Sequence, residues 1–407
     1  MTTPVRLLDG SGPDLVTDFE LTAPVDIADR TSDGVRRTRA WIVLRDHGLP
    51  VGMLTLAIPD GGLPAAAVTE AFTGVRVPDP AALQAARERA CRDGATVTAV
   101  VCTRERPEAL RRCLESLLRQ DYPHATILVV DNAPTSEATC RVVADFPSVR
   151  YVVEPRPGLS RARNRALAEI DTELVAWIDD DEVADVRWLT EIARAFLEYP
   201  DAAGMSGVVV PAEIETAAQA WYEAFGGHSK GRGFTAADFV PGAMRQSPLY
   251  PLPPFGVGAN MAFRHTDLVA VGGFDEALGA GTLAEGGEDT LIFTRLLLAD
   301  RPLLYRPAAL TRHYHRRETE RLAAQMRGYG VALTAFYTSL LLDRPLLLPR
   351  LLRLAPTALR DVSSGGSLRN IGLREGMPSE FMSLNKRGMA IGPWRYLRSR
   401  RQVRRDS

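Results

Sequence analysis

From Thr96 onward, short apolar runs of strand length alternate with segments of helical periodicity. The apolar runs are 97–101, 127–130, 149–153, 174–178 and 205–209. Apolar residues recur at helical spacing over 107–120, 160–169 and 186–199. This alternation predicts an α/β fold with a mainly parallel, doubly wound sheet. Because ligands of such sheets bind beyond the carboxyl ends of the strands, the residues that follow each run are the first candidates for chemistry.

The two ends of the chain follow other patterns. Two β-rich runs, 40–44 and 51–57, flank the polar turn 46–48 and predict a hairpin, and a helix is expected over 80–92. We therefore divide the chain into a small α+β appendage (1–93), a main α/β domain (94–316) and a helical, Leu- and Arg-rich C-terminal region (317–407).

After the last of these runs the alternation is interrupted. Residues 225–256 are rich in Gly and Pro and predict a mobile loop beside the site. A strand at 260–264 and helices at 291–299 and 317–342 are expected to follow. The tail, apolar over 340–354, ends in RYLRSRRQVRRDS. This basic amphipathic pattern fits either a surface that rests on the inner face of a membrane or a helical pair packed on the main domain.

Charge and composition narrow the function classes. With 49 basic and 50 acidic residues the formal net charge is -1, so no global field would attract nucleic acid. No stretch reaches the ~20 apolar residues that span a bilayer, and the N-terminus lacks the basic flank and apolar run of a signal peptide. The four cysteines show no paired spacing. We expect a cytoplasmic protein.

The strongest chemical feature is a run of three carboxylates, Asp179, Asp180 and Asp181, directly after the apolar run 174–178. Two carboxylates one residue apart at a strand end can turn toward the same point, where their oxygens suit Mg²⁺ or Mn²⁺ bridged to phosphates. An acidic turn that caps the helix beginning near Val186 is the alternative.

Other strand ends carry weaker candidates. Asp131 follows the run 127–130, where a carboxylate can accept hydrogen bonds from a ribose or nucleobase, although an ordinary turn before Pro134 fits as well. Thr103 and Arg104 follow the first run and are ambiguous alone. The segment GLSRARN opens a helix whose predicted N-cap is Ser160. Its arginines could pair with a base or diphosphate, or form a solvated basic face.

The ordered series TAVVCTRERPEALRRCLESLLRQDYPHATILVVDNAP, GLSRARNRAL, AWIDDDE, GVGANMAFR, VGGFDE and GGEDT resembles the family 2 glycosyltransferases of GT-A (Rossmann-like) fold, from about Thr96 to His315. The resemblance implies a D-x-D element in which Asp181 binds the metal directly and Asp179 faces the ribose or a metal-bound water. It also implies a donor-nucleotide site. Its candidate residues are Thr103, Arg104, Asp131, Arg161, Asn164, Asp179, Asp180 and Arg316.

The family's ED element matches Glu288 and Asp289, at the predicted start of a helix. By resemblance, Asp289 is the base that takes the proton of the acceptor hydroxyl; a helix-initiating acidic pair is the alternative. Further along, His313-Tyr314-His315-Arg316 follows a strand-like segment. The resemblance places a His of this region near the metal or diphosphate, and we predict His315 as a metal ligand and Arg316 as a donor contact.

These features predict an inverting, single-displacement glycosyltransferase that uses Mg²⁺ or Mn²⁺ and a nucleotide diphosphate sugar, with a UDP-sugar the expected donor. The acceptor hydroxyl is not identified by the sequence. A convincing Q-x-x-R-W element is absent, which disfavours a processive polysaccharide synthase. Two other functions stay open: a non-catalytic nucleotide-sugar-binding module, and a sugar nucleotidyltransferase, whose early Gly-rich loop has no counterpart in CTRERPEAL.

Overall fold

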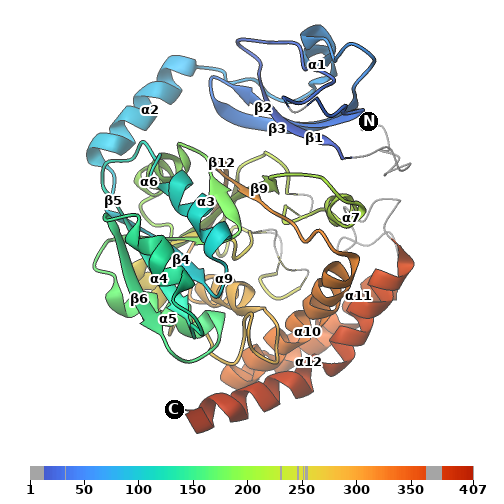
Figure 1. The fold of residues 1–407 in the computed structure, drawn as a ribbon. Coiled ribbons are helices and arrows are strands. Elements are labelled where there is room, and N and C mark those ends of the chain that lie inside the picture. Colours follow the sequence, from blue (N-terminus) through green and yellow to red (C-terminus); the bar gives the residue numbers. More distant parts are fainter. Residues whose placement is uncertain are drawn as a thin grey trace.

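The computed structural model describes residues 13–363 and 378–406, except 33, 230–231, 245–246, 251 and 253–254. The chain forms a small N-terminal sheet, a large mixed α/β unit and a C-terminal group of helices that lies along the lower right side of the molecule in Figure 1.

The N-terminal sheet contains β1 (Leu15–Glu20), β2 (Arg39–Asp46) and β3 (Leu49–Ala57), in that order. The predicted hairpin is present: β2 and β3 are antiparallel, and His47 and Gly48 take the positive φ values, 52° and 73°, that a tight two-residue turn requires. Helix α1 (Ala65–Ala71) adds Val68 to the apolar core of this unit. The connecting helix α2 (Pro80–Asp93) begins where Asp79 accepts the N–H of Ala82.

Charged and aromatic contacts hold the N-terminal sheet on the large unit. Arg45 of β2 donates to Asp185 at 2.5 Å, and Asp18 of β1 forms an ion pair with Arg312. The buried Trp41 packs against Ile214. The appendage therefore contacts the main unit at several points along its length.

The large sheet has the order β10-β12-β9-β11-β7-β4-β5-β6, with β8 paired to β12. Its strands are β4 (Val97–Thr103), β5 (Ala125–Asn132), β6 (Val149–Glu154), β7 (Leu174–Asp179), β8 (Glu182–Ala184), β9 (Gly204–Pro211), β10 (Ala237–Phe239), β11 (Asn260–Arg264) and β12 (Leu303–His313). The predicted parallel pairing holds for β6-β5-β4-β7. Strand β11 lies antiparallel between β7 and β9, so the sheet is mixed rather than uniformly parallel. Almost every residue of β4 and β9 is buried, as expected for strands covered on both faces.

Helices cover both faces of this sheet and build two apolar cores. One core includes residues of α3 (Pro107–Leu117), α4 (Ala138–Ala144) and α6 (Trp188–Glu198). The other includes residues of α5 (Leu159–Glu169), α8 (His265–Ala270) and α9 (Glu288–Leu298). The segment predicted as a loop over 225–256 contains the short strand β10, and parts of it lie outside the described residues.

The C-terminal helices are α10 (Thr319–Asp343), α11 (Leu348–Ser363) and α12 (Ser379–Asp406), with a 3-10 turn at Pro345–Leu347. Helices α10 and α12 approach closely, because a Cβ on Gly330 or Gly388 would lie within 2.2 Å of backbone atoms of the opposite helix. In the described part of the chain no single helix is long and apolar enough to cross a membrane; α10 and the segment 345–361 meet that test only together, with a bend of 114°.

Candidate active site

Three neighbouring strands end at the same edge of the large sheet. In the register of the sheet, Thr103 at the end of β4 lies opposite Asp131 of β5, and Cys102 lies opposite Asp179 of β7. The hydroxyl of Thr103 donates a 2.7 Å hydrogen bond to Asp180. The predicted polar residues of these three strand ends are therefore brought together.

Asp131 is completely buried at this edge. The hydroxyl of Tyr151 donates to its Oδ2 at 2.8 Å, while Oδ1 has no hydrogen bond to the described part of the chain. Burial raises the pKa of Asp131 above its usual value, although the Tyr151 hydrogen bond opposes the shift. A buried carboxylate oxygen without a donor is suited to accept a hydrogen bond from a ligand.

Asp181 lies in a ring of cationic and imidazole groups. Its carboxylate accepts from Arg106 at 3.0 Å and lies 3.3 Å from Nη1 of Arg316 and 3.2 Å from Nε2 of His313. Burial alone would raise the pKa of Asp181, but His313, Arg316 and Arg106 outweigh it and hold that pKa below its usual range. Asp181 is therefore held in the ionised form that a metal ligand requires.

The pairing of β8 with β12 explains how His313 reaches Asp181. Strand β8 follows the three aspartates directly, and its Glu182 lies opposite His313 in the antiparallel register. His313 is buried, and desolvation lowers the pKa of its imidazole despite the nearby Asp181. In its neutral form, the imidazole of His313 forms with the carboxylate of Asp181 a nitrogen and oxygen donor set that fits Mn²⁺, and the carboxylate oxygens also suit Mg²⁺.

A second carboxylate group is organised by Arg163, whose guanidinium is buried. It donates to Glu288 at 2.8 Å and to the carbonyl of Gly258 at 3.0 Å, and it lies 3.7 Å from Asp179. The backbone N–H of Gly258 in turn donates to Oδ2 of Asp289 at 2.7 Å. Arg163 and Gly258 thus connect the end of β7 to the start of α9.

The carboxyl of Asp179 has an unusual proton affinity. Burial, together with the charges of Asp181 and Asp180, raises its pKa to about 7, although Arg163 opposes the shift.

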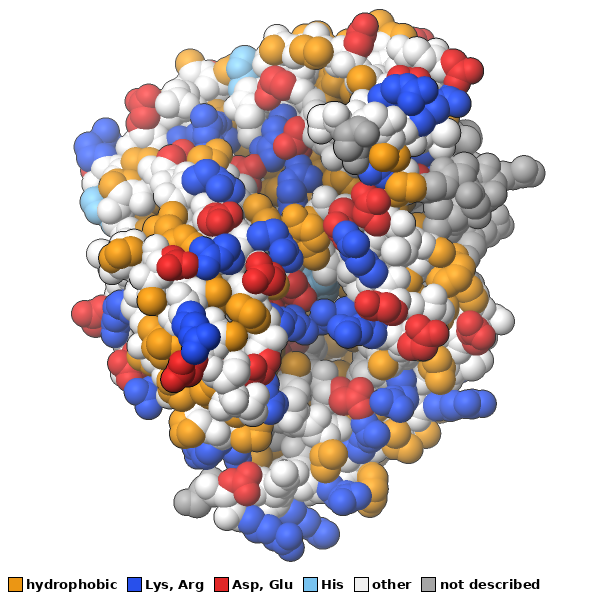
Figure 2. Space-filling view, in the orientation of Figure 1, with side chains coloured by type: hydrophobic (Ala, Val, Ile, Leu, Met, Phe, Trp, Pro, Cys, Tyr) orange, Lys and Arg blue, Asp and Glu red, His pale blue; other side chains and the backbone are white. Residues whose placement is uncertain are grey.

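Acidic and basic side chains meet around a hollow near the centre of the face shown in Figure 2.

The structure gives two predicted donor contacts other partners. Arg161 donates to Glu276 at 3.1 Å and lies 3.3 Å from Asp406, away from the three aspartates. The amide of Asn164 accepts the backbone N–H of Phe274 and donates to its C=O. Arg104 is exposed at the end of β4. The geometry therefore favours Arg163, which the sequence reasoning did not single out, over Arg161 and Asn164.

Ser160, the predicted N-cap of α5, does not cap this helix. Gly158, with φ 136°, precedes the helix, and the hydroxyl of Ser160 donates instead to the carbonyl of Leu278. The first turn of α5 is therefore fixed by the loop that precedes α9.

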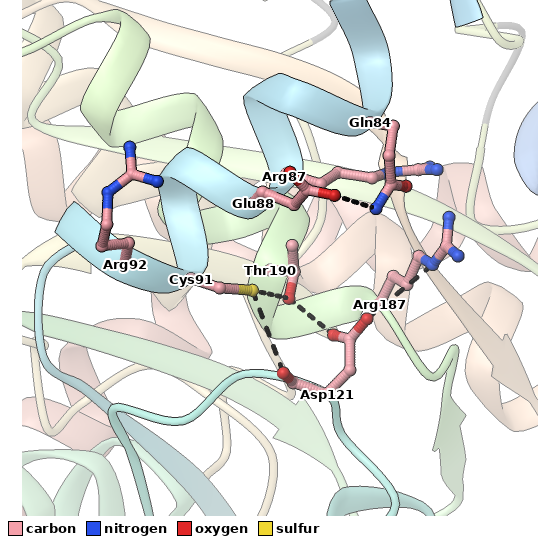
Figure 3. Close-up of a pocket in the computed structure, with 8 residues that line it drawn as sticks. All are labelled: Gln84, Arg87, Glu88, Cys91, Arg92, Asp121, Arg187 and Thr190. Carbon is pink, nitrogen blue, oxygen red and sulfur yellow. Dashed lines mark hydrogen bonds and ion pairs between the residues drawn. The ribbon is translucent and has the colours of Figure 1, made fainter. Parts of the chain in front are cut away.

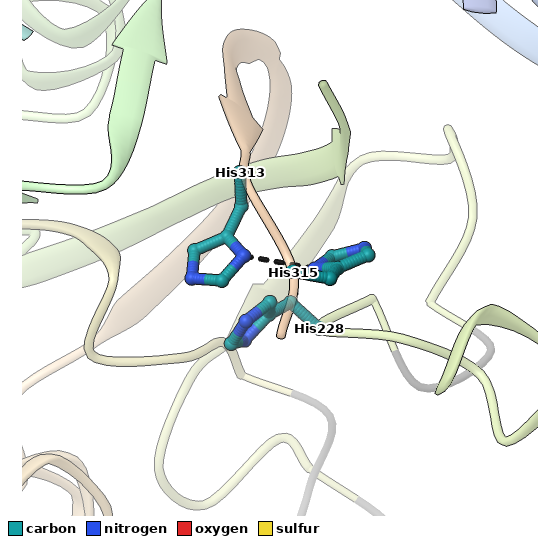
Figure 4. Close-up of side chains that lie close together, drawn as sticks. All are labelled: His228, His313 and His315. Atoms are coloured by element: carbon teal, nitrogen blue, oxygen red, sulfur yellow. Dashed lines mark hydrogen bonds between the residues drawn. The ribbon is translucent and has the colours of Figure 1, made fainter. Parts of the chain in front are cut away.

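His315, the predicted metal ligand, lies one step away from Asp181. Its Nδ1 is 2.8 Å from Nδ1 of His313, and its Nε2 is 2.6 Å from Oε1 of Glu223 in α7 (Ala217–Ala224). A third imidazole, His228, packs edge-on against His313, and the ligand atoms of the three histidines lie within 4.8 Å of one another (Figure 4). Both nitrogens of His315 are occupied, so His313 is the histidine positioned to share a cation with Asp181.

A separate pocket of about 340 Å³ lies between α2 and α6 (Figure 3). It is lined by five residues of α2 and three from elsewhere: Gln84, Arg87, Glu88, Cys91 and Arg92, with Asp121, Arg187 and Thr190. None of the predicted site residues lines it, and Arg87 is held by a 2.7 Å ion pair to Glu191. This pocket is not part of the candidate active site.

Residues 98–270 match the sequence profile of the family described as Glycosyl transferase family 2. The chain contains a glycosyl transferase family 2 domain. It is 30% identical over 195 residues to the glucosyl-dolichyl phosphate glucuronosyltransferase of Haloferax volcanii, covering 45% of this chain and 57% of that protein. It is 29% identical over 244 residues to the pre-mycofactocin glycosyltransferase of Mycobacterium tuberculosis, covering 58% of this chain and 46% of that protein. The chain thus spans about half the length of the curated relatives it matches.

Among solved structures, the family 2 domain and its surroundings resemble the mannosyltransferase PcManGT from Pyrobaculum calidifontis, solved in complex with GDP-Man and Mn²⁺. The TM-score is 0.50 at 19% identity, with 77% of this chain and 97% of that chain covered. This likeness confirms the predicted GT-A fold.

Proposed function

We propose that this protein is a glycosyltransferase that moves a sugar from a nucleotide diphosphate sugar to an acceptor hydroxyl, in one displacement with inversion. The observation that carries the proposal is the continuous set of contacts from Asp131 and Thr103, through Asp180 and its neighbours, to Arg163, Gly258 and Asp289. Acidic groups from distant parts of the chain thereby meet at one edge of the sheet, where GT-A-like sheets bind their ligands.

The donor nucleotide would lie along the ends of β5, β4 and β7. Asp131 offers its unpaired oxygen to the ribose or nucleobase. Thr103 would orient Asp180 rather than contact the donor itself, because its hydroxyl already donates to that carboxylate. Arg106 and Arg316 converge on Asp181 and supply positive charge where the diphosphate would sit.

Asp181 and His313 would hold the Mg²⁺ or Mn²⁺ ion. When bound, the ion would neutralise charge on the leaving diphosphate. Asp181 is kept ionised by its basic neighbours, and the buried imidazole of His313 is held 3.2 Å away. This assignment replaces His315 by His313 as the ligand from the end of β12.

Asp289 is the proposed base. Its Oδ2 is fixed by the N–H of Gly258, and its Oδ1 accepts the backbone N–H of Thr290 at 2.6 Å, so the carboxylate has one orientation. Taking the proton of the acceptor hydroxyl allows the oxygen to attack the sugar opposite the diphosphate, which inverts the anomeric centre. Glu288 is engaged by Arg163 and is assigned the role of holding that arginine rather than of moving protons.

A thermal-shift screen of UDP- and GDP-sugars, with and without Mn²⁺, tests the donor proposal, because a bound ligand raises the melting temperature by mass action. We expect one donor class to stabilise the protein only with metal, and Asp181→Asn to abolish that shift while the exposed Asp201→Asn retains it. Product analysis separates the rival enzyme: free nucleoside diphosphate supports the proposal, whereas pyrophosphate indicates a nucleotidyltransferase. Binding without any sugar transfer to a panel of hydroxyl acceptors would indicate the non-catalytic module.

We also propose that the C-terminal helices rest on an anionic membrane surface at the cytoplasmic side. Eight of the 28 residues of α12 are basic and two are acidic, so this helix carries +6 while the rest of the chain carries −7. Basic side chains gather along the lower right edge of Figure 2, where α12 runs in Figure 1.

Exposed apolar side chains accompany this charge. Leu352 and Leu359 on α11 are 62% and 71% exposed, and Trp394 on α12 is 58% exposed beneath the guanidinium of Arg398. Leu, Trp and Arg on the outer surface of helices are typical of segments that lie in a membrane interface. The inner surface of α12 packs on α10, so the two arrangements considered for the tail are compatible.

Flotation with vesicles tests this surface. The full chain should bind vesicles that contain anionic lipid, with binding weakened by salt, and Leu352→Ser/Leu359→Ser/Trp394→Ser should reduce binding about tenfold or more. Equal binding by this triple variant and the parent chain would refute the surface.

A further inference from the structure

The hydrogen-bonded series Glu223, His315, His313 ends at the metal-binding carboxylate Asp181. The three steps are 2.6 Å from Glu223 Oε1 to His315 Nε2, 2.8 Å between the two Nδ1 atoms, and 3.2 Å from His313 Nε2 to Asp181 Oδ1. All four side chains are buried or nearly so. No mechanism described above uses Glu223 or His315.

When both imidazoles are neutral, proton counting fixes the direction of this series. A carboxylate only accepts hydrogen bonds, so Nε2 of His315 carries the proton that is donated to Glu223. A neutral His315 then has a lone pair on Nδ1, and the contact between the Nδ1 atoms requires the proton to lie on Nδ1 of His313. Neutral His313 consequently presents the lone pair of Nε2 toward Asp181.

This arrangement has a direct consequence for metal binding. A lone pair on Nε2 facing a carboxylate oxygen at 3.2 Å is repulsive unless a cation lies beside both atoms. The reverse arrangement, with His315 protonated on both nitrogens, would place a proton on Nε2 of His313 and donate it to Asp181, and that proton would block metal coordination. A cation at Asp181 therefore selects the first arrangement.

We propose that Glu223 and His315 are positioning residues that set the tautomer of His313, so that its Nε2 can coordinate the divalent cation held by Asp181. The inference rests on the proposed function, since it specifies how that metal site is built. It resembles the usual arrangement in which a ligating histidine donates its second N–H to a supporting group, which fixes the ring and raises its basicity.

Helix α7 holds the outer end of this series rigidly. A capping box between Thr216 and Gln219 fixes its first turn, and Gln219 also donates to the carbonyl of His315 at 3.2 Å. The ring of Tyr222 packs edge-on against His315 at 4.7 Å. Both the backbone and the ring of His315 are thus fixed by the helix that supplies Glu223.

The three-histidine group offers a competing cation site, which the contacts disfavour. Coordination by His315 would require it to release either Glu223 or His313, because both of its nitrogens are engaged. In the proposed arrangement the ring of His228 packs edge-on against His313 and need not coordinate the cation. The two sites make opposite predictions for Asp181 and His228 variants.

Mn²⁺ affinity, measured from the electron paramagnetic resonance signal of free Mn²⁺ in the presence of UDP or GDP, tests the proposal without turnover. Glu223→Leu, which removes the acceptor of the His315 proton, and His315→Leu should weaken Mn²⁺ binding about 10- to 100-fold, the usual range for supporting groups of a metal site. In His315→Asn the amide oxygen can still accept the proton of His313 Nδ1, so part of the affinity should return. Glu320→Gln, an exposed substitution on α10, should bind as the parent chain does.

Nitrogen-15 spectra of the histidine rings with diamagnetic Mg²⁺ supply a structural readout. We expect Nδ1 of His313 to carry the proton in the loaded protein, with Nε2 unprotonated. A proton on Nε2 of His313 in that state, or parental Mn²⁺ affinity in Glu223→Leu, would overturn the inference. If His228→Gln weakened Mn²⁺ binding and Asp181→Asn did not, the three-histidine site would replace it.

These results are separable from the proposed function. Parental Mn²⁺ affinity in Glu223→Leu, together with loss in His313→Asn and Asp181→Asn, would remove only the positioning role. Parental affinity in all three variants would remove the metal site itself.

Discussion

The N–H of Gly258 points directly at Oδ2 of Asp289, 2.7 Å away, from a backbone segment that also gives its carbonyl to Arg163. The same glycine leaves little room: a Cβ at position 258 would lie 3.0 Å from both Cβ and Oδ2 of Asp289. The side chain proposed to accept the hydroxyl proton is thus set by a close backbone contact.

Two substitutions separate the chemistry of Asp289 from its placement. Asp289→Asn should lower kcat about 10²- to 10⁴-fold, the usual contribution of a general base, while the metal-dependent thermal shift by the donor is retained. Gly258→Ala should lower kcat about 10- to 100-fold by displacing the carboxylate. Initial rates and melting temperatures on the same samples provide the check. A fully active Asp289→Asn protein would exclude this residue as the base.

Asp131 should contribute to nucleoside affinity rather than to the transfer step. Asp131→Asn leaves a neutral amide at a buried position, and we expect it to weaken nucleoside diphosphate binding by about 1–3 kcal/mol. Tyr151→Phe removes only the hydroxyl that orients Asp131 and should cost less. Isothermal titration with UDP and GDP in the presence of Mn²⁺ measures both effects. Unchanged affinity in Asp131→Asn would place the nucleoside elsewhere.

The buried carboxyl of Glu182 should make the free energy of unfolding depend on pH. Burial, with the nearby charges of Asp179 and Asp181, raises the pKa of Glu182 well above its usual value, so the folded protein holds a proton that the unfolded chain releases above about pH 4.5. The stability that this proton supports is present at low pH and is lost as the pH rises, with a slope of at most about 1.4 kcal/mol per pH unit.

The isosteric Glu182→Gln should remove this contribution. Its free energy of unfolding should fall less steeply between pH 5 and pH 8 than that of the parent chain, as measured by urea denaturation across that range. Identical slopes in the two proteins would mean that Glu182 is not protonated in the folded state.

Arg163 should be required for both stability and activity. It is buried and pairs with Glu288, while Asp179 lies 3.7 Å away. Arg163→Met leaves the Glu288 carboxylate buried without its partner, which costs about 3–5 kcal/mol. The exposed Arg104→Met provides a matched control for folding. Urea denaturation of both variants checks the difference, and equal stability would contradict the buried network.

The sequence predicted the framework because each framework strand is a local apolar run that ends in a polar residue. Asp131, Thr103 and Asp179 were placed at one edge by this rule, and the structure brings their strands together in register. The insertion of β11 antiparallel between β7 and β9 could not be read from a five-residue segment, since only the partners of a strand fix its direction.

The sequence could not select which of two neighbouring arginines or histidines faces the site. Arg161 and Arg163 lie on nearly opposite sides of α5, and which one faces the strand ends depends on how the helix is entered at Gly158. His313 and His315 share a face, but the long-range pairing of β12 with β8 decides that His313 reaches Asp181. In both cases the local pattern identified the right segment and tertiary contacts selected the residue. The proposed boundaries at 93/94 and 316/317 stay predictions.

The small N-terminal sheet contacts both β8 and β12, the two strands whose ends would supply the cation ligands. Arg45 holds Asp185, just beyond β8, and Asp18 holds Arg312, the residue before His313. A chain that begins at Thr96 would therefore lack both of these contacts. Such a chain would keep Asp181, His313 and Asp289, but we expect it to bind the cation more weakly, because β8 and the end of β12 would lose the side chains of β1 and β2 that hold them in place.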